Sequence, residues 1–123
     1  MAKSSVTALA EVEVSNPHQI MFADLLTKQL EGVANTEVVV SVTTVPPNTT
    51  LPKHWHPGEE CAYVLEGSFT LWQEGKPDEH YRKGDTAMIP LKQVHTISTK
   101  DEGATALVFR VHESGQPGRT LVD

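Results

Sequence analysis

The feature that most restricts the fold of this chain is a succession of short β-forming segments, each ending at glycine or proline. The run EVVVSVTTV at 37–45 is rich in β-branched residues and stops at Pro46 and Pro47. Similar short runs follow as far as ATALVFRVH at 104–112, and no long helical pattern appears after residue 36. Many short strands joined by turns predict an all-β fold, an antiparallel sandwich or barrel.

The length of 123 residues suits one domain with one modest core. We expect residues 1–35 to form an N-terminal arm with the first strand or strands, residues 36–112 the barrel, and residues 113–123 a C-terminal tail. The segment HQIMFADLLTKQL at 18–30 fits either a short helix or a strand from about Leu25 to Leu30, because its helical period is imperfect. The sequence alone does not decide between the two.

Composition and charge exclude several classes of partner. The net charge is −6 and the pI about 5.4, so the surface repels phosphate backbones and we expect no nucleic-acid partner. No basic amphipathic segment and no stretch of about 20 apolar residues indicates a membrane. Cys61 is the only cysteine, so no internal disulfide is predicted. Because the N-terminus does not look like a signal peptide, we expect a cytoplasmic protein.

The segment HWHPGEE at 54–60 brings two imidazoles and a carboxylate close together in the sequence. On a strand, His54 and His56 share one face. Pro57 and Gly58 predict a break, after which a hairpin-like return brings Glu60 back over the two imidazoles. Farther along, proline and turn signals place His95 at the start of another strand. A metal ion is a common partner for such a group.

At this point the chain resembles the cupin family of small β-barrels. The first cupin motif is matched by His54, His56, Glu60 and Gly67, and the second by Gly84, Pro90 and His95. The resemblance covers roughly residues 36 to 112, and the two motifs together are far more specific than either alone. It implies an antiparallel double-stranded β-helix, the jelly-roll barrel.

Three positions depart from the family pattern, and none is a ligand position. Asn48 stands where the first motif opens with glycine, and asparagine can adopt the left-handed backbone that glycine would supply. Lys92 and Thr99 replace a glycine and an asparagine of the second motif. We expect the changes at Lys92 and Thr99 to alter the local turn and to leave the metal site intact.

The resemblance implies one divalent transition metal per chain, held by His54, His56, Glu60 and His95. Imidazole suits Fe, Ni, Cu and Zn, and a carboxylate extends the choice to Mn, so Fe, Mn, Ni or Zn is expected. Four protein ligands on a six-coordinate ion leave two positions open for water, substrate or dioxygen.

Three kinds of function follow. The first is a metal-dependent oxidoreductase of dioxygenase type that acts on a small molecule, and the second is an isomerase or lyase that uses the metal as a Lewis acid. In either enzyme, Glu60 is the expected catalytic base by analogy within the family. The third is a non-catalytic binding or sensor protein. We also expect a homodimer, with outward-facing Trp55 and the N-terminal arm as apolar surface to bury.

Strand alternation gives further expectations. Ala62 and Val64 share the face of Glu60 and are expected to line the cavity near the metal. Phe109 is expected in the core. Arg110 and Lys92 could steer an anionic substrate, although an exposed, solvated position is the first expectation for both.

Overall fold

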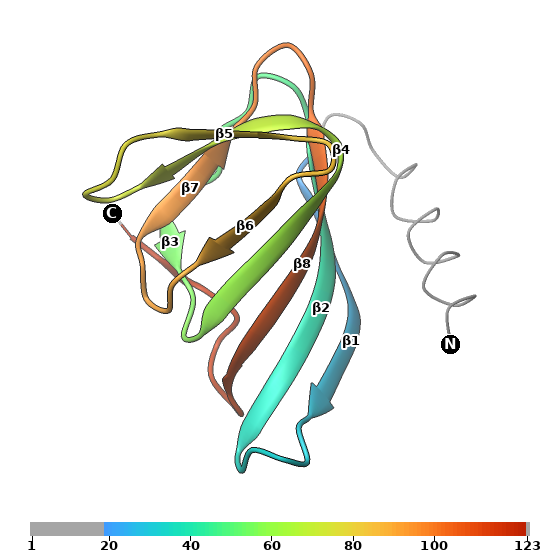
Figure 1. Ribbon diagram of the computed structural model, residues 1–123, viewed down its shortest axis with the longest axis vertical. Helices are drawn as coiled ribbons and strands as arrows, with labels where there is room; N and C mark the ends of the chain where they lie inside the picture. The colour runs from blue at the N-terminus through green and yellow to red at the C-terminus, as the bar shows by residue number, and fades with distance from the viewer. Residues whose placement is uncertain (1–18, 123) are drawn as a thin grey trace.

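The computed structural model describes residues 19–122, which form nine antiparallel strands and no helix. No helix that could cross a membrane is therefore found among these residues. The strands curl into a barrel-like double sheet, as Figure 1 shows. Their bounds are β1 Met21–Gln29, β2 Thr36–Val45, β3 His54–Trp55, β4 Glu59–Gln73, β5 Glu79–Arg82, β6 Thr86–Ile89, β7 His95–Ser98, β8 Ala104–Glu113 and β9 Thr120–Leu121.

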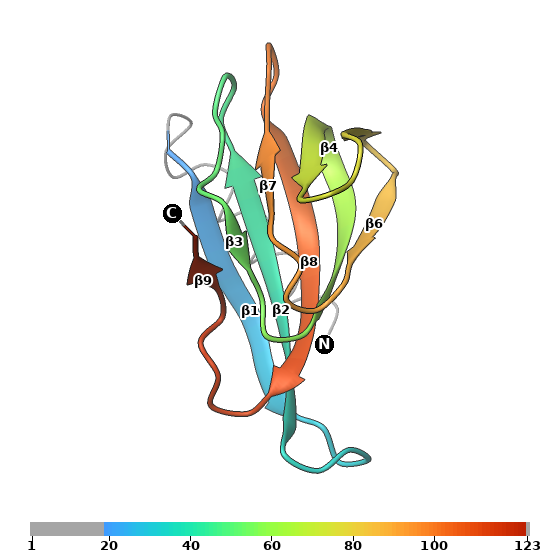
Figure 2. The ribbon, with the colours of Figure 1, turned by 90° about the vertical axis from the view of Figure 1, so that its left-hand side faces the viewer.

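The strands form two connected layers that share β4. One layer runs β1-β2-β8-β4-β6 and the other runs β5-β4-β7-β3-β9. Strands β1, β2 and β8 lie side by side in Figure 2, with β3 and β7 across from them. The expectation of an antiparallel double-stranded β-helix is confirmed.

Strand β4 turns from one layer into the other at Gly67. Its first half pairs with β8 and β6, and its second half, from Ser68 on, pairs with β5 and β7. Gly67 has a positive φ of 75°, and a Cβ there would lie 1.8 Å from the carbonyl oxygen of Gly103. Only glycine fits this corner, which explains the glycine that ends the first motif.

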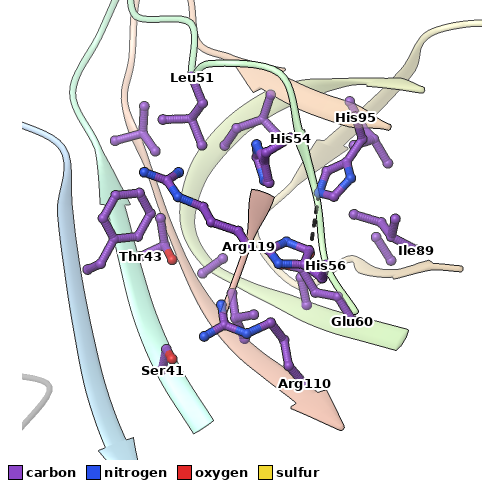
Figure 3. A pocket seen from close by; sticks show the side chains of 18 of the residues that line it. Ser41, Thr43, Leu51, His54, His56, Glu60, Ile89, His95, Arg110 and Arg119 are labelled. Carbon is purple, nitrogen blue, oxygen red and sulfur yellow. Dashed lines mark ion pairs between the residues drawn. The ribbon is translucent and has the colours of Figure 1, made fainter. Parts of the chain in front are cut away.

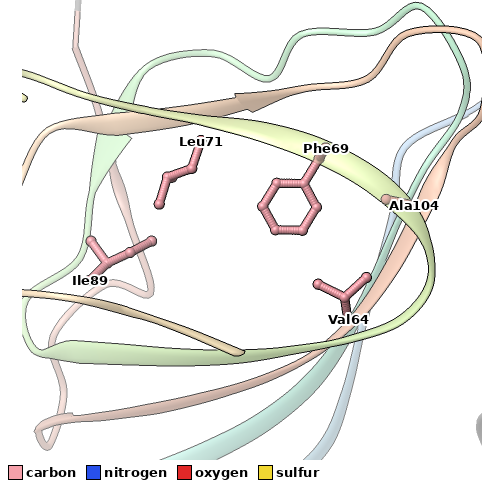
Figure 4. Close-up of a cluster of buried hydrophobic side chains, with 5 residues drawn as sticks. All are labelled: Val64, Phe69, Leu71, Ile89 and Ala104. Atoms are coloured by element: carbon pink, nitrogen blue, oxygen red, sulfur yellow. The ribbon is translucent and has the colours of Figure 1, made fainter. Parts of the chain in front are cut away.

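The apolar core lies between the two layers near this corner. Figure 4 shows its five buried side chains facing one another: Val64, Phe69, Leu71, Ile89 and Ala104. Val64 and Leu71 are almost fully buried, each 1% exposed. The expectation for Phe109 is wrong, because its side chain is 44% exposed on the outer face of β8, while the neighbouring Val108 is buried.

The structure shows that two segments near the ends of the chain form strands. The sequence left open whether residues 18–30 form a helix or a strand, and the structure shows a strand. This strand, β1, pairs with β2 and has one register irregularity between Asp24 and Leu26. In the expected tail, Thr120 and Leu121 form strand β9, which pairs with β3. The C-terminal segment is thus part of the barrel. The N-terminal part of the expected arm, residues 1–18, lies outside the described residues.

The structure shows the local conformation at the three positions that depart from the family pattern. Asn48 and Lys92 both adopt a left-handed backbone, with φ of 55° and 59°. The amide of Lys92 donates to the carbonyl of His56 at 2.9 Å, next to the predicted metal site. The hydroxyl of Thr99 donates to the carbonyl of Pro46 at 2.6 Å and so fastens the loop before β3.

Candidate metal centre

The predicted ligands come from three strands and one turn. His54 in β3 lies in register with His95, the first residue of β7. His56 follows β3 directly, and Glu60 is the second residue of β4. The turn between them passes close to β8, because a Cβ on Gly58 would lie 1.7 Å from the carbonyl oxygen of Val111. The predicted break at Pro57 and Gly58 and the return of Glu60 are both confirmed.

The three histidines meet in the interior. His54 and His56 are each 5% exposed and His95 is 2% exposed. The distances between their ring centroids are 4.4 Å from His54 to His95, 5.0 Å from His54 to His56 and 5.1 Å from His56 to His95. One ligand nitrogen from each ring lies within 4.8 Å of the other two. Such a group can bind one ion.

Backbone carbonyls orient all three rings. The Nδ1 atom of His54 lies 2.7 Å from the carbonyl oxygen of Pro52, that of His56 lies 2.8 Å from Gly118, and that of His95 lies 2.8 Å from Gln93. A carbonyl can only accept, so each Nδ1 donates its hydrogen. In a neutral ring, Nε2 is then left without a hydrogen, as a metal ligand requires.

Glu60 completes the group. Its Oε1 atom lies 2.8 Å from Nε2 of His56 and 3.4 Å from Nε2 of His95. In neutral rings these nitrogens are acceptors, so lone pairs of nitrogen and oxygen face each other, and both the nitrogen of His56 and the oxygen of Glu60 are buried without a hydrogen-bond partner. A cation between them resolves this conflict, and the donor set of three imidazoles and one carboxylate therefore fits a divalent transition metal.

Burial and neighbouring groups shift two pKa values at the site. Burial is the main cause that lowers the pKa of His54 to about 4; the hydrogen bond to Pro52 acts against it, and the nearby His95 and His56 rings act in the same direction as burial. Burial on its own would raise the pKa of Glu60, but the close ring nitrogens of His56 and His95 outweigh it and hold that pKa well below its usual range. At neutral pH, His54 is therefore neutral and Glu60 charged, the forms that ligate a metal.

A cavity of about 300 Å³ opens beside these ligands. Ala62 lines it as expected, whereas Val64 packs in the core. Arg110 also lines the cavity, so the first expectation of a solvated position for this arginine is wrong, while Lys92 is exposed as expected. Figure 3 shows the guanidinium groups of Arg110 and Arg119 in the cavity beside the imidazoles.

Sequence reasoning missed Gly118 and Arg119, which orient His56 and line the cavity. No signal near them predicted this, because the segment ESGQPGRT looks like a polar tail.

Comparison with known proteins agrees with the geometry. The model of the Cupin domain family matches residues 41–111, which is more than half of the chain. No curated protein matches the chain.

Several solved structures share the fold. One is an uncharacterized conserved protein with a double-stranded β-helix domain from Klebsiella pneumoniae subsp. pneumoniae MGH 78578, with a TM-score of 0.71 and 22% identity over 94% of both chains. A cupin-like protein from Thermotoga maritima MSB8 has a TM-score of 0.68 and 23% identity over 85% of this chain and 77% of its own.

The DMSP lyase DddQ from Ruegeria pomeroyi DSS-3 has a TM-score of 0.71 and 24% identity over 85% of this chain and 52% of its own. The chain thus spans about half the length of that lyase. At such identities the likeness to these structures concerns the fold. Because the family model spans the barrel and both motifs, the chain belongs to the cupin family.

Proposed function

We propose that this protein is a metal-dependent enzyme that acts on a small organic molecule. The observation that carries the proposal is the orientation of the three imidazoles. Each donates Nδ1–H to a backbone carbonyl and leaves Nε2 free in one buried group next to Glu60. The adjoining cavity of about 300 Å³ is at the lower end of the range for small-molecule sites.

In this proposal His54, His56, His95 and Glu60 hold one divalent metal, with Fe, Mn, Ni or Zn as the candidates. The bound metal would supply Lewis acidity and coordination positions for substrate or dioxygen. The carbonyl partners keep the rings in position, and the apolar cavity wall excludes water from the reacting atoms. Glu60 is the candidate base, since its carboxylate lies beside the ligand nitrogens and lines the cavity.

A dioxygenase-type reaction is the first candidate, because four protein ligands leave room for both substrate and dioxygen. A lyase reaction is the second candidate, and the observation that favours it is the similarity of fold to two DMSP lyase structures. A non-catalytic binding protein would use the same cavity without turnover.

Metal analysis followed by two reaction screens tests this proposal. We expect about one transition metal per chain in the purified protein, and its loss on substitution of His54, His56 or His95 by alanine. Oxygen uptake with small diketones, phenols and thiols would identify a dioxygenase, and anaerobic release of an unsaturated product would identify a lyase. Full metal occupancy in all three alanine variants would refute the assignment of the ligands.

Two expectations from the sequence stay predictions: the cytoplasmic location and the homodimer. Trp55 is partly buried and offers little apolar surface for a dimer interface. The outer face of the layer that contains β8 is the better candidate for that interface. There, Phe109 lies in register with Cys61, which is in turn in register with Met88. Phe109 and Met88 are 44% and 64% exposed.

A further inference from the structure

Arg110 brings a charged side chain into an otherwise largely apolar cavity. It lies on β8 directly opposite Glu60 of β4 and lines the same cavity as the three histidines. Its Nε atom is buried and has no hydrogen-bond partner. Among residues 19–122, no carboxylate lies within ion-pair distance of this guanidinium group.

A buried, unpartnered guanidinium nitrogen is costly to the folded protein, because the group loses hydration and gains no bond in return. The acids that line the cavity are engaged elsewhere. Glu60 faces His56 and His95, and Asp24 accepts a hydrogen bond from the hydroxyl of Ser41 at 2.7 Å. Arg110 therefore has donor capacity left for a group from outside.

Arg119 adds a second positive charge at the same cavity. Its side chain is exposed, and its guanidinium carbon lies 4.9 Å from the centre of the Phe22 ring, another residue of the cavity wall. The preceding Gly118 runs close to Arg110, since a Cβ on that glycine would lie 3.7 Å from Nη2 of Arg110. The two arginines thus come from neighbouring segments, one half-buried with a buried Nε atom and one at the surface.

Most of the remaining cavity wall is apolar, apart from Asp24, Ser41 and Thr43. Leu51, Leu71 and Ile89 line it and are buried. An occupant that satisfies this wall and Arg110 together needs an anionic group attached to a compact apolar body.

We propose that Arg110 and Arg119 form an anion subsite, and that the substrate is a small organic carboxylate. The planar guanidinium group matches a carboxylate in a bidentate arrangement. Because Arg110 and Glu60 are register partners, the carboxylate would lie one strand away from the metal ligands and keep the rest of the molecule near the metal. The identity of the substrate rests on the proposed function. The anion subsite does not, because it can be tested by binding alone.

Binding of benzoate, compared with its neutral analogue benzamide, tests the subsite by isothermal titration calorimetry on the purified, metal-loaded protein. We expect benzoate to bind at least tenfold more tightly than benzamide, a preference of the size expected for a charge-assisted contact. Arg110→Met should remove roughly this tenfold preference, Arg110→Lys should keep part of it, and Arg119→Met should weaken it. Arg82→Met is the matched control, because Arg82 is exposed on β5 and does not line this cavity.

Metal content, measured on every variant, separates this inference from the proposed function. Unchanged metal together with a lost preference for benzoate supports the anion subsite. Benzoate that binds Arg110→Met and Arg119→Met as tightly as the unaltered protein, and is released when the metal is chelated, would show that the carboxylate sits on the metal and would overturn the subsite. Absence of metal from the unaltered protein would refute the proposed function and leave the comparison of benzoate with benzamide valid.

Discussion

The burial of His54 predicts that the metal-free protein loses stability in mild acid. Burial lowers the pKa of His54 from 6.5 to about 4 in the folded protein. As the pH falls below about 6.5, the unfolded chain takes up a proton at this residue before the folded chain does. His54 therefore contributes stability that is fully present above its unfolded pKa and is lost as the pH falls toward about 4.

The size of the effect follows from the shift. One pKa unit corresponds to about 1.4 kcal/mol, so the full change between 6.5 and about 4 amounts to about 3 kcal/mol. At about pH 5, the loss should reach about 2 kcal/mol, a large part of the stability of a small domain. This pH is suitable because the pKa of Glu60 is lowered in the folded protein. Its carboxylate therefore stays charged at about pH 5 and does not contribute a protonation of its own in the folded state.

Urea unfolding with a chelator present, at about pH 7.5 and about pH 5, measures the change. His54→Gln is the comparison variant, since glutamine is polar and does not titrate. We expect the free energy of unfolding to fall by about 2 kcal/mol more in the unaltered protein than in His54→Gln. Equal falls in the two proteins would refute the reasoning that burial suppresses the charge of His54.

Three other changes test the catalytic, backbone and assembly predictions. Glu60→Gln preserves volume and removes the charge; steady-state turnover should fall about 10²–10⁴-fold, more than metal content falls, and parallel losses would contradict a role as base. Lys92→Gly should raise the free energy of unfolding, measured in urea, by about 0.5–1 kcal/mol because the backbone there is left-handed, whereas Lys100→Gly should lower it. Phe109→Arg should convert the expected homodimer to a monomer in sedimentation at unchanged metal content; a monomeric unaltered protein would exclude the dimer.

The residues of the candidate metal centre could be predicted from the sequence because three of them are closely spaced. The positions of His54, His56 and Glu60 follow from one strand, one break and one return, and His95 begins a strand after a proline-containing turn. A double-stranded β-helix joins these pieces in only a few ways. Short-range spacing and the fold class together therefore bring the four side chains into one place.

The part of the cavity wall that strand β8 contributes could not be predicted, because the largest apolar side chain of this strand points outward. Its inward positions are Ala104, Ala106, Val108 and Arg110, whereas the larger Phe109 points outward. Small inward residues leave the volume that a ligand needs, and a charged one supplies a contact. A hydrophobic pattern indicates which positions are most apolar, and in this strand the most apolar side chain is on the outside.

The C-terminal segment connects the candidate metal centre to the proposed anion subsite. The carbonyl of Gly118 accepts the hydrogen of His56, and Thr120 and Leu121 pair with the strand that holds His54. Between them, Arg119 lines the cavity. Residues 118–121 have no periodicity to recognise, yet they orient one candidate ligand ring, pair with the strand that holds another and place a charge at the cavity. Metal binding and substrate binding are therefore expected to depend on the same stretch of backbone, whereas Arg110 belongs to the long strand β8, and Arg110→Met should leave the metal content unchanged.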